Sequence, residues 1–145
     1  MKVCIAYESK YGNGKQCMEY LRDVLNKDGH DVDLFSVREK DPKSLPEADL
    51  YVFSSPTQIG SPTRKMKKFL KKLEVPAEDA KYTLVTTYMN PKATTLEKME
   101  RLLQPKGLTK ISEGLRIQVT DMKGPCESGF KEKLEIFAKN IAGGK

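Results

Sequence analysis

The residues that could bind an anion are concentrated in Glu8-Ser9-Lys10-Tyr11-Gly12-Asn13-Gly14-Lys15, directly before a helical pattern. Backbone N–H groups at a helix start, together with the positive end of the helix dipole, bind phosphate, and glycines let the backbone approach it closely. Ser9 and Asn13 could add side-chain hydrogen bonds, and Lys10 and Lys15 could add positive charge. The segment therefore indicates a phosphate cradle, with an ordinary helix N-terminus capped near Asn13 as the alternative.

Three established types of phosphate loop do not fit this segment. A Walker loop needs Ser or Thr after Gly14-Lys15, but Gln16 follows, and Ser9 occupies the place of the first glycine. A dinucleotide motif fails because Cys17 occupies the position of its third glycine. A cysteine phosphatase would carry the thiol in the loop with an arginine after it, whereas Cys4 lies inside the preceding apolar run, as an inert core residue would.

Two further loops could complete a binding site. Residues 54–62 form a constrained stretch between two prolines, and residues 86–91 follow another apolar run. Both offer backbone amides and an apolar or flat side chain, although Tyr88 could equally pack on its own loop. Together, the three segments suggest a phosphorylated planar ligand, with its anion on the first loop and its ring between the other two.

The elements that must position these loops alternate along the chain. Short apolar runs predict buried strands, and apolar residues at three- and four-residue steps predict amphipathic helices. The expected strands are 3–7, 32–35, 50–53, 82–87 and 115–119, and the expected helices are 13–27, a segment starting near Pro62, 95–103 and 127–141. Because parallel neighbours need right-handed crossovers, this order predicts an α/β fold with a doubly wound five-stranded parallel sheet. Its ligand site should lie beyond the carboxyl ends of the strands.

Composition favours a single domain of residues 1–142 with a C-terminal tail at 143–145. No stretch approaches the ~20 apolar residues of a membrane span, so no membrane partner is expected. The only histidine, His30, lies in a turn-like setting, which disfavours histidine chemistry. The 26 basic and 20 acidic residues give a net charge of +6, which by itself suggests nucleic acid, a membrane surface or an acidic protein as partner.

The three cysteines are too few and too dispersed for a disulfide framework or a zinc knuckle. We therefore expect a reducing compartment and a cytoplasmic protein. Cys17 falls on the apolar side of its helix and is expected in the core. Cys126 precedes the last helix and is expected to be exposed, where a helix start stabilises a thiolate.

Two motifs resemble those of a known family. Residues 9–14 resemble the phosphate loop of flavodoxins, usually Ser/Thr-x-Thr-Gly-Asn-Thr, and residues 48–57 resemble the third strand and flavin loop of that family. The chain is similar to a short-chain flavodoxin along nearly all of its length. The resemblance implies strand order 2-1-3-4-5, FMN as cofactor and one-electron transfer between redox proteins. It implies that the phosphate lies on Ser9, Lys10, Tyr11, Gly12, Asn13 and Gly14, and that the ring edges meet Ser55, Pro56, Thr57, Gln58, Ile59, Gly60, Thr87, Tyr88, Met89 and Asn90.

The chain departs from the family pattern in two places. Gly14 replaces the last threonine of the phosphate loop, which removes a hydrogen bond to a charged group worth about 1.5–3 kcal/mol. The chain has no Trp, and Ile59 lies where an aromatic residue is expected, so Tyr88 is the best candidate to stack on the ring, with Met89 or Ile59 as apolar cover. These departures predict weaker FMN binding and leave open a flavodoxin-like domain that has lost FMN.

A strongly basic segment follows the second candidate loop. It contains Arg64, Lys65, Lys67, Lys68, Lys71 and Lys72. It could be a solvated helix face, or a docking patch near Arg64 and Lys65 for an acidic redox protein such as ferredoxin or a reductase. Nucleic acid is disfavoured because no recognition motif accompanies the charge. Since flavodoxins are usually acidic, the net positive charge predicts a less reducing carrier.

No side chain in the three loops is an obvious nucleophile or general acid, so the chain itself is not expected to be an enzyme. The alternative is a small FMN-dependent quinone or NAD(P)H oxidoreductase, because Pro56-Thr57-Gln58-Ile59-Gly60 has some likeness to the flavin loop of that family. Such enzymes usually need a dimer-built pocket and longer insertions, which 145 residues scarcely allow.

Overall fold

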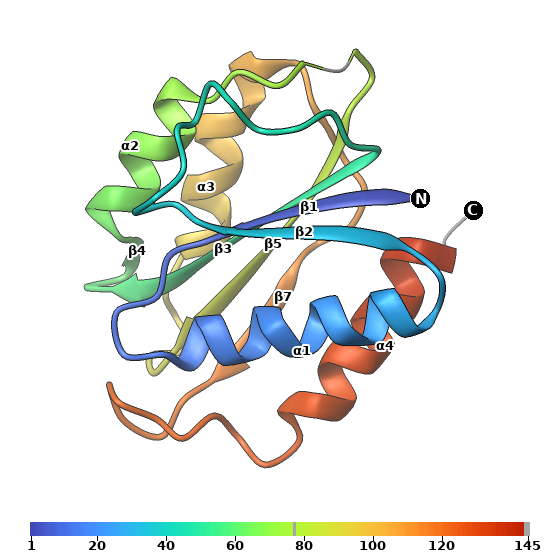
Figure 1. The fold of residues 1–145 in the computed structure, drawn as a ribbon. Helices are drawn as coiled ribbons and strands as arrows, with labels where there is room; N and C mark the ends of the chain where they lie inside the picture. The colour runs from blue at the N-terminus through green and yellow to red at the C-terminus, as the bar shows by residue number, and fades with distance from the viewer. Residues whose placement is uncertain (77, 144–145) are drawn as a thin grey trace.

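A mainly parallel sheet forms the centre of the molecule, which a computed structural model describes for residues 1–76 and 78–143 (Figure 1). Within these residues the sheet has seven strands: β1 (Lys2–Tyr7), β2 (Asp31–Ser36), β3 (Leu50–Gln58), β4 (Ser61–Pro62), β5 (Lys81–Tyr88), β6 (Thr109–Lys110) and β7 (Leu115–Gln118). The order is β2-β1-β3-β5, and β6 and β7 both pair with β5. The predicted order 2-1-3-4-5 is confirmed, with β5 as the fourth and β7 as the fifth of the predicted strands.

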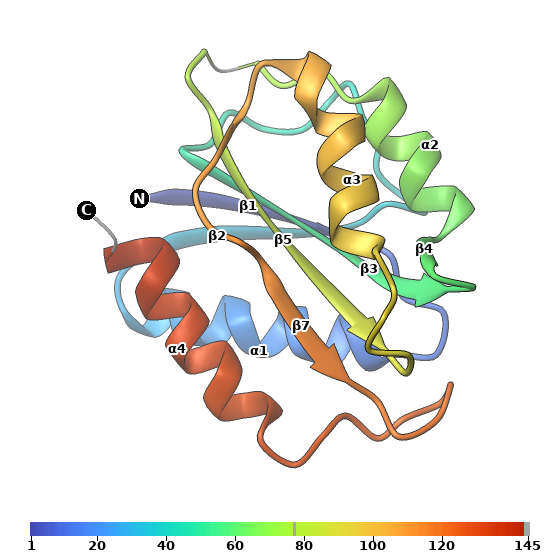
Figure 2. The ribbon, with the colours of Figure 1, turned by 180° about the vertical axis from the view of Figure 1, so that it is seen from behind.

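Helices cover both faces of the sheet. They are α1 (Asn13–Lys27), α2 (Arg64–Lys72), α3 (Thr95–Leu103) and α4 (Phe130–Gly143), with a 3-10 turn, η1, at Gln104–Lys106. Figures 1 and 2 show α1 and α4 on one face and α2 and α3 on the other. Successive side chains of β1 therefore point to opposite faces of the sheet. Val3 and Ile5 join the core under α1, and Cys4 and Ala6 join the core on the opposite face.

Strand β3 continues beyond the end that the sequence predicts. Residues 54–56 were expected in a loop, but they pair with β5, and the chain then turns back as β4. Pro62 therefore lies in β4 rather than in the first helical turn. Helix α2 begins at Arg64 because Thr63 caps it, its side chain accepting a hydrogen bond from Met66 N–H at 3.2 Å.

Some ends of the helices and strands follow from the local sequence pattern, and others depend on contacts with distant residues. The predicted helices 13–27 and 95–103 match α1 and α3. Helix α4 begins at Phe130 instead of 127, because Glu127 is bound to Gln118 at the end of β7. The short strand β6 was not predicted. Of the predicted tail 143–145, Gly143 ends α4 and the last two residues lie outside the described part of the chain.

The expectation that Cys126 is exposed is wrong. Only 7% of Cys126 is accessible, and its sulfur lies 3.8 Å from that of Cys17. Burial raises the pKa of the Cys126 thiol, so a reactive thiolate is not favoured. In the described part of the chain, no helix is long and apolar enough to cross a bilayer.

Candidate functional site

A cavity lies where β1, β3 and β5 end, and the three loops expected from the sequence contribute to it. Its lining comprises Ser9, Lys10, Tyr11, Asn13, Gly14, Pro56, Thr57, Gln58, Thr87, Tyr88, Met89, Val119 and Met122. Eleven of these thirteen residues were among the predicted site residues, whereas Val119 and Met122 were not. Both follow β7, whose carboxyl end lies at the same edge of the sheet, so applying the strand-end rule to the fifth strand would have found them.

The start of α1 forms an anion cradle. Gly12 adopts a left-handed conformation with φ of 96°, which glycine accepts without strain. The Ser9 hydroxyl oxygen accepts hydrogen bonds from Gly12 N–H at 3.1 Å and from Lys15 N–H at 3.2 Å. Within the described residues, no protein acceptor meets the N–H groups of Asn13 and Gly14, as expected in the first turn of a helix. These two amides are therefore available to an anion.

Gly14 has no side chain, so a ligand can lie close to the backbone of the cradle. A Cβ atom at Gly14 would lie 3.4 Å from the Glu8 carbonyl oxygen and 3.8 Å from the Ser9 hydroxyl. The Asn13 amide group donates to the Met122 carbonyl at 3.1 Å, which attaches the segment after β7 to the phosphate cradle. The fourth segment thus closes one side of the cavity.

An ion pair between a buried carboxylate and a partly exposed guanidinium lies directly before the cradle in sequence. Glu8 is 1% exposed, and its carboxylate accepts a hydrogen bond of 2.6 Å from the guanidinium Nε of Arg38. This bond raises the pKa of Arg38 and keeps the charge of the buried carboxylate balanced. Glu8 directly follows β1 and Arg38 is the second residue after β2, and these strands pair so that Tyr7 lies opposite Ser36. This pair could not be predicted from the sequence, because it depends on the register of two strands.

Tyr88 has a fixed orientation in the wall of the cavity. The guanidinium of Arg116 lies over its ring, 4.7 Å from the centroid, and also donates to the carbonyls of Pro91 at 2.9 Å and Ala93 at 3.1 Å. A cation over an aromatic face is attractive, so Arg116 holds the ring in place. The arginine is a positioning residue that the sequence did not reveal.

Hydroxyl groups fix the end of β3. The Thr57 hydroxyl lies 2.9 Å from that of Thr86 and 2.6 Å from that of Thr95 on α3. Ser55 is completely buried; its hydroxyl donates to the Pro56 carbonyl at 2.9 Å and accepts from the N–H of Thr63, the cap of α2, at 3.1 Å. Ser55 therefore holds the strand end in place and does not line the cavity.

Four other predicted residues also lie outside the lining: Gly12, Ile59, Gly60 and Asn90. Gly12 shapes the cradle through its backbone, and the Asn90 side chain accepts a hydrogen bond from Lys92 N–H within its own turn. Ile59 and Gly60 form the turn between β3 and β4, and the Ile59 side chain is fully exposed.

Apolar side chains surround the mouth of the cavity. Tyr11, Met89 and Met122 are exposed by 39%, 46% and 55%. The cavity is open to solvent and its inner volume is about 80 Å³, so a flat ring would lie partly at the mouth. A ring there would contact these side chains, and unbranched methionines adapt to such a contact at little cost.

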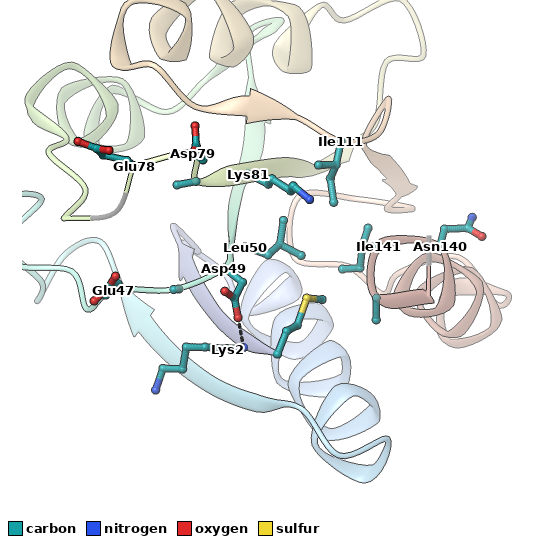
Figure 3. A pocket seen from close by; sticks show the side chains of 14 residues that line it. Lys2, Glu47, Asp49, Leu50, Glu78, Asp79, Lys81, Ile111, Asn140 and Ile141 are labelled. Atoms are coloured by element: carbon teal, nitrogen blue, oxygen red, sulfur yellow. Dashed lines mark hydrogen bonds between the residues drawn. The ribbon is translucent and has the colours of Figure 1, made fainter. Parts of the chain in front are cut away.

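A much larger hollow of about 880 Å³ lies at the opposite end of the sheet (Figure 3). Four carboxylates line it: Glu47, Asp49, Glu78 and Asp79. The backbone N–H of Lys2 donates to Asp49 at 2.8 Å. The lining also contains Lys2 and Lys81, but the carboxylates outnumber these lysines, which makes the hollow less favourable for a phosphate. No carboxylate side chain is among the described residues that line the cavity at the carboxyl ends.

The position and chemistry of the cavity agree with the comparison with known families. The flavodoxin family model matches residues 5–130. The chain belongs to the flavodoxin family. No protein with a curated description matches it in sequence.

Solved structures of other flavodoxins have the same fold. Flavodoxin 2 of Bacillus cereus is 23% identical, with a TM-score of 0.84, and the flavodoxin of Streptococcus pneumoniae TIGR4 is 22% identical, with a TM-score of 0.81; both comparisons cover 100% of both chains. Rubredoxin oxygen:oxidoreductase of Desulfovibrio gigas is 16% identical, with a TM-score of 0.81. The match covers 99% of this flavodoxin but only 35% of that enzyme.

FMN is the cofactor of flavodoxins, and the residues of the cavity fit it. The cradle supplies two available amides and two nearby lysines for a phosphate, and Gly14 keeps the approach free of a side chain. Tyr88, Met89 and Met122 supply apolar surface for a flat ring, while Thr57, Gln58 and Thr87 supply polar groups for its edges. The family membership assigns electron transfer with FMN to this chain.

Proposed function

We propose that this flavodoxin is a one-electron carrier between redox proteins and holds FMN in the cavity at the carboxyl ends of β1, β3 and β5. One observation carries the proposal: the anion cradle at the start of α1 and the ring of Tyr88 line the same cavity. None of the described residues that line this cavity has a carboxylate side chain. FMN, when bound, supplies the redox chemistry. The protein binds the cofactor, orients it and excludes water from it.

Each group of residues has a separate task in this proposal. The amides of Asn13 and Gly14, with Ser9, Lys10 and Lys15, would hold the phosphate. Tyr88, backed by Arg116, would lie against the ring. The strand end fixed by the Thr57 hydroxyl would present backbone groups to the ring edge. An open mouth would leave one edge accessible to another protein.

The basic face of α2 supports an acidic partner. We name this surface, made of Arg64, Lys65, Lys67, Lys68, Lys71 and Lys72, the α2 basic surface. Within the described part of the chain, no carboxylate forms an ion pair with any of the six. Unbalanced positive charge beside the flavin turn would steer a negatively charged protein, such as ferredoxin or a reductase, towards the mouth of the cavity.

The exposed apolar residues at the mouth fit the same role. Ile59, Met89 and Met122 are all exposed, and they surround or adjoin the cavity. A partner that makes contact here would cover apolar surface close to the electron donor or acceptor, while the charged surface sets its orientation. The proposed contact is thus apolar at its centre and charged on one side.

An absorption spectrum and a reduction assay test the proposal. The purified protein should bind FMN in one-to-one ratio, turn yellow and accept electrons only through a partner reductase. Quinone reduction by NADPH without a protein partner would support the alternative of an FMN-dependent oxidoreductase. Colourless protein that ignores added FMN would overturn both and support a domain that has lost its cofactor.

A further inference from the structure

Two of the three cysteines form a close pair in the core on the α1 face of the sheet. The sulfur of Cys17, on α1, lies 3.8 Å from that of Cys126, which lies between β7 and α4, and both thiols are free. Both residues belong to the same apolar core, whereas Cys4 belongs to the core on the opposite face. Since the sulfurs of a disulfide are about 2.05 Å apart, an approach of less than about 2 Å would join this pair.

The chain around Cys126 is closed into a loop by its own hydrogen bonds. Glu127 N–H donates to the Gln118 carbonyl at 2.8 Å, and Val119 pairs with Cys126 in an isolated antiparallel bridge. We name residues 118–127 the β7–α4 loop. Its two ends are therefore held together, and Cys126 lies at this closed base.

The β7–α4 loop contacts the start of α1 at its tip as well as at its base. The Asn13 side chain donates to the Met122 carbonyl at 3.1 Å, and a Cβ atom at Gly124 would lie 2.4 Å from the Asn13 side-chain oxygen. Figures 1 and 2 show this loop running past the start of α1. Val119 and Met122 line the cavity at the carboxyl ends of the strands. A covalent bond at the base would therefore hold one wall of the cavity against α1.

We propose that Cys17 and Cys126 are a redox modification site, at which a peroxide forms a disulfide that fastens the β7–α4 loop to α1. The formation of the disulfide is independent of any cofactor. Its effect on FMN release rests on the proposed function, because Val119 and Met122 would contact FMN only if the cofactor occupies their cavity.

The disulfide forms in two steps. Cys126 is 7% exposed and Cys17 is fully buried, so a small peroxide reaches Cys126 first. The Cys126 thiolate attacks one peroxide oxygen, the O–O bond breaks, and the leaving hydroxide takes up the thiol proton, which oxidises the sulfur by two electrons to a sulfenic acid. The Cys17 sulfur then attacks the Cys126 sulfur, the S–S bond forms, the S–O bond breaks, and water leaves with the Cys17 proton. One hydrogen peroxide is consumed and two waters are released.

Burial affects the two steps in opposite ways. It raises the pKa of the Cys126 thiol, so little thiolate is present and the attack on peroxide is slow. The second step is intramolecular, and the two sulfurs are already 3.8 Å apart, so Cys17 captures the sulfenic acid before a second peroxide reaches it. The expected product is therefore the disulfide and not a sulfinic acid.

A count of free thiols tests the formation of the disulfide and needs no cofactor. The wild type is treated with hydrogen peroxide, unfolded and alkylated, and its mass is measured. Untreated protein should carry three alkyl groups, and oxidised protein should carry one, on Cys4. A proteolytic digest should contain the peptides of Cys17 and Cys126 joined by a disulfide. Dithiothreitol added before alkylation should restore all three groups.

Two substitutions of buried cysteines provide the matched comparison. Cys17→Ala removes the second thiol, so Cys126 should gain two oxygen atoms as a sulfinic acid and form no cross-link. Cys4→Ala, in the opposite core, should form the same cross-link as the wild type. If Cys17→Ala does not fold, the digest of the wild type decides alone. Three alkylated cysteines after peroxide treatment, or a cross-link that includes Cys4, would overturn the proposal.

The mobility of the loop tests what the disulfide does. The N–H groups of Thr120 and Gly124 are hydrogen-bonded within the loop, to the carbonyls of Pro125 and Asp121. Their exchange with solvent, measured by NMR without FMN, should be about tenfold slower in the disulfide form. Dithiothreitol reverses a disulfide but not a methionine sulfoxide, so treated and then reduced protein should exchange like untreated protein. Equal exchange in the two forms would show that the disulfide does not fasten the loop.

Release of FMN connects the disulfide to the cavity. FMN fluorescence after dilution of the loaded protein should show release about fivefold slower in the disulfide form, because one wall of the cavity is held closed. Slower amide exchange with unchanged release would overturn the effect on the cavity and leave the disulfide standing. If the wild type binds no FMN, the proposed function falls, and the thiol count and the amide exchange still decide whether Cys17 and Cys126 fasten the loop.

Discussion

The two ends of the central sheet carry hollows that differ in size and in chemistry. The cavity at the carboxyl ends of the strands is about 80 Å³, and the hollow at the other end is about 880 Å³. The small one has helix amides, Lys10 and no carboxylate among its described lining residues, whereas the large one has four carboxylates and only two lysines. Backbone donors and the sign of the charge therefore select the phosphate site, and volume does not.

Placing an acid in the cradle should produce the largest effect. Asn13→Asp keeps the size of the side chain but adds a negative charge beside the amides and removes the donor to the Met122 carbonyl. FMN affinity should fall about 100-fold, or ~2.8 kcal/mol, in a fluorescence titration. Folding should not suffer comparably, because an acid near a helix N-terminus is stabilising.

The matched control lies at the other end of the sheet. Asp49→Asn removes a carboxylate from the large hollow and should leave FMN affinity within about twofold, since a distant surface charge is screened. A strong loss of FMN binding in this variant would mean that the large hollow takes part in binding.

The ion pairs at the two ends of the sheet should also differ in how much they stabilise the fold. Arg38→Met leaves the Glu8 carboxylate buried without its partner, and the free energy of unfolding should fall by about 2 kcal/mol in a urea titration. That value is below the usual range for buried pairs because the guanidinium side chain is 42% exposed and solvent screens it.

Lys2→Met is the corresponding change at the opposite end. Lys2 pairs with Asp31 and Asp33 at 3.2 and 2.8 Å, but these carboxylates are 76% and 35% exposed, so water solvates them when the lysine is lost, whereas Glu8 is buried. Its loss should lower stability less than the Arg38 substitution does. The reverse order would contradict the view that the buried carboxylate of Glu8 depends on Arg38.

Restoring the family residue at position 14 should strengthen binding. Gly14→Thr adds a hydroxyl donor at the cradle, and the space admits a Cβ at ordinary contact distance, 3.4 Å from the Glu8 carbonyl. FMN affinity should rise about tenfold, or ~1.4 kcal/mol. Gly14→Ala supplies the Cβ without the hydroxyl and should give no gain. Equal affinity of the two variants would mean that the hydroxyl does not reach the phosphate.

Charge on the α2 basic surface should affect the rate of partner binding and leave cofactor affinity unchanged. Changing Arg64, Lys65 and Lys68 to glutamine should slow electron transfer to an acidic ferredoxin about fivefold at low salt, with the difference lost at high salt. Stopped-flow reduction at several ionic strengths measures this. As a control, Lys131, Lys133 and Lys139 on α4 can be changed together, with an expected smaller effect.

The sequence predicts the fold best where local chemistry decides it. Glycine and polar residues bound α1 on both sides, and its apolar positions recur at helical spacing, so residues 13–27 are identified correctly. The end of β3 was missed because Ser54, Ser55 and Pro56 are typical of a loop. In the structure their pairing with β5, together with hydroxyl bonds to Thr63 and Thr86, makes them a strand.

In the candidate site too, contacts that depend on strand pairing could not be predicted from the sequence. Tyr88 could be predicted because it lies at the carboxyl end of a strand. Arg116, which fixes its ring, comes from β7, and its position depends on how that strand pairs with β5. Cys126 was expected to be exposed because only its neighbours in sequence were considered. A bridge between Val119 and Cys126 brings it against Cys17 on α1, and this contact depends on the tertiary fold.

Amide chemical shifts recorded during an FMN titration test the central claim most directly. We predict that the shifts concentrate at residues 9–14, 57–58, 87–89 and 119–122, with the Asn13 and Gly14 amides among the most affected. Residues 47–50 and 78–81, which line the large hollow, should not move. Shifts that concentrate at the large hollow, or no shifts at saturating FMN, would contradict the account.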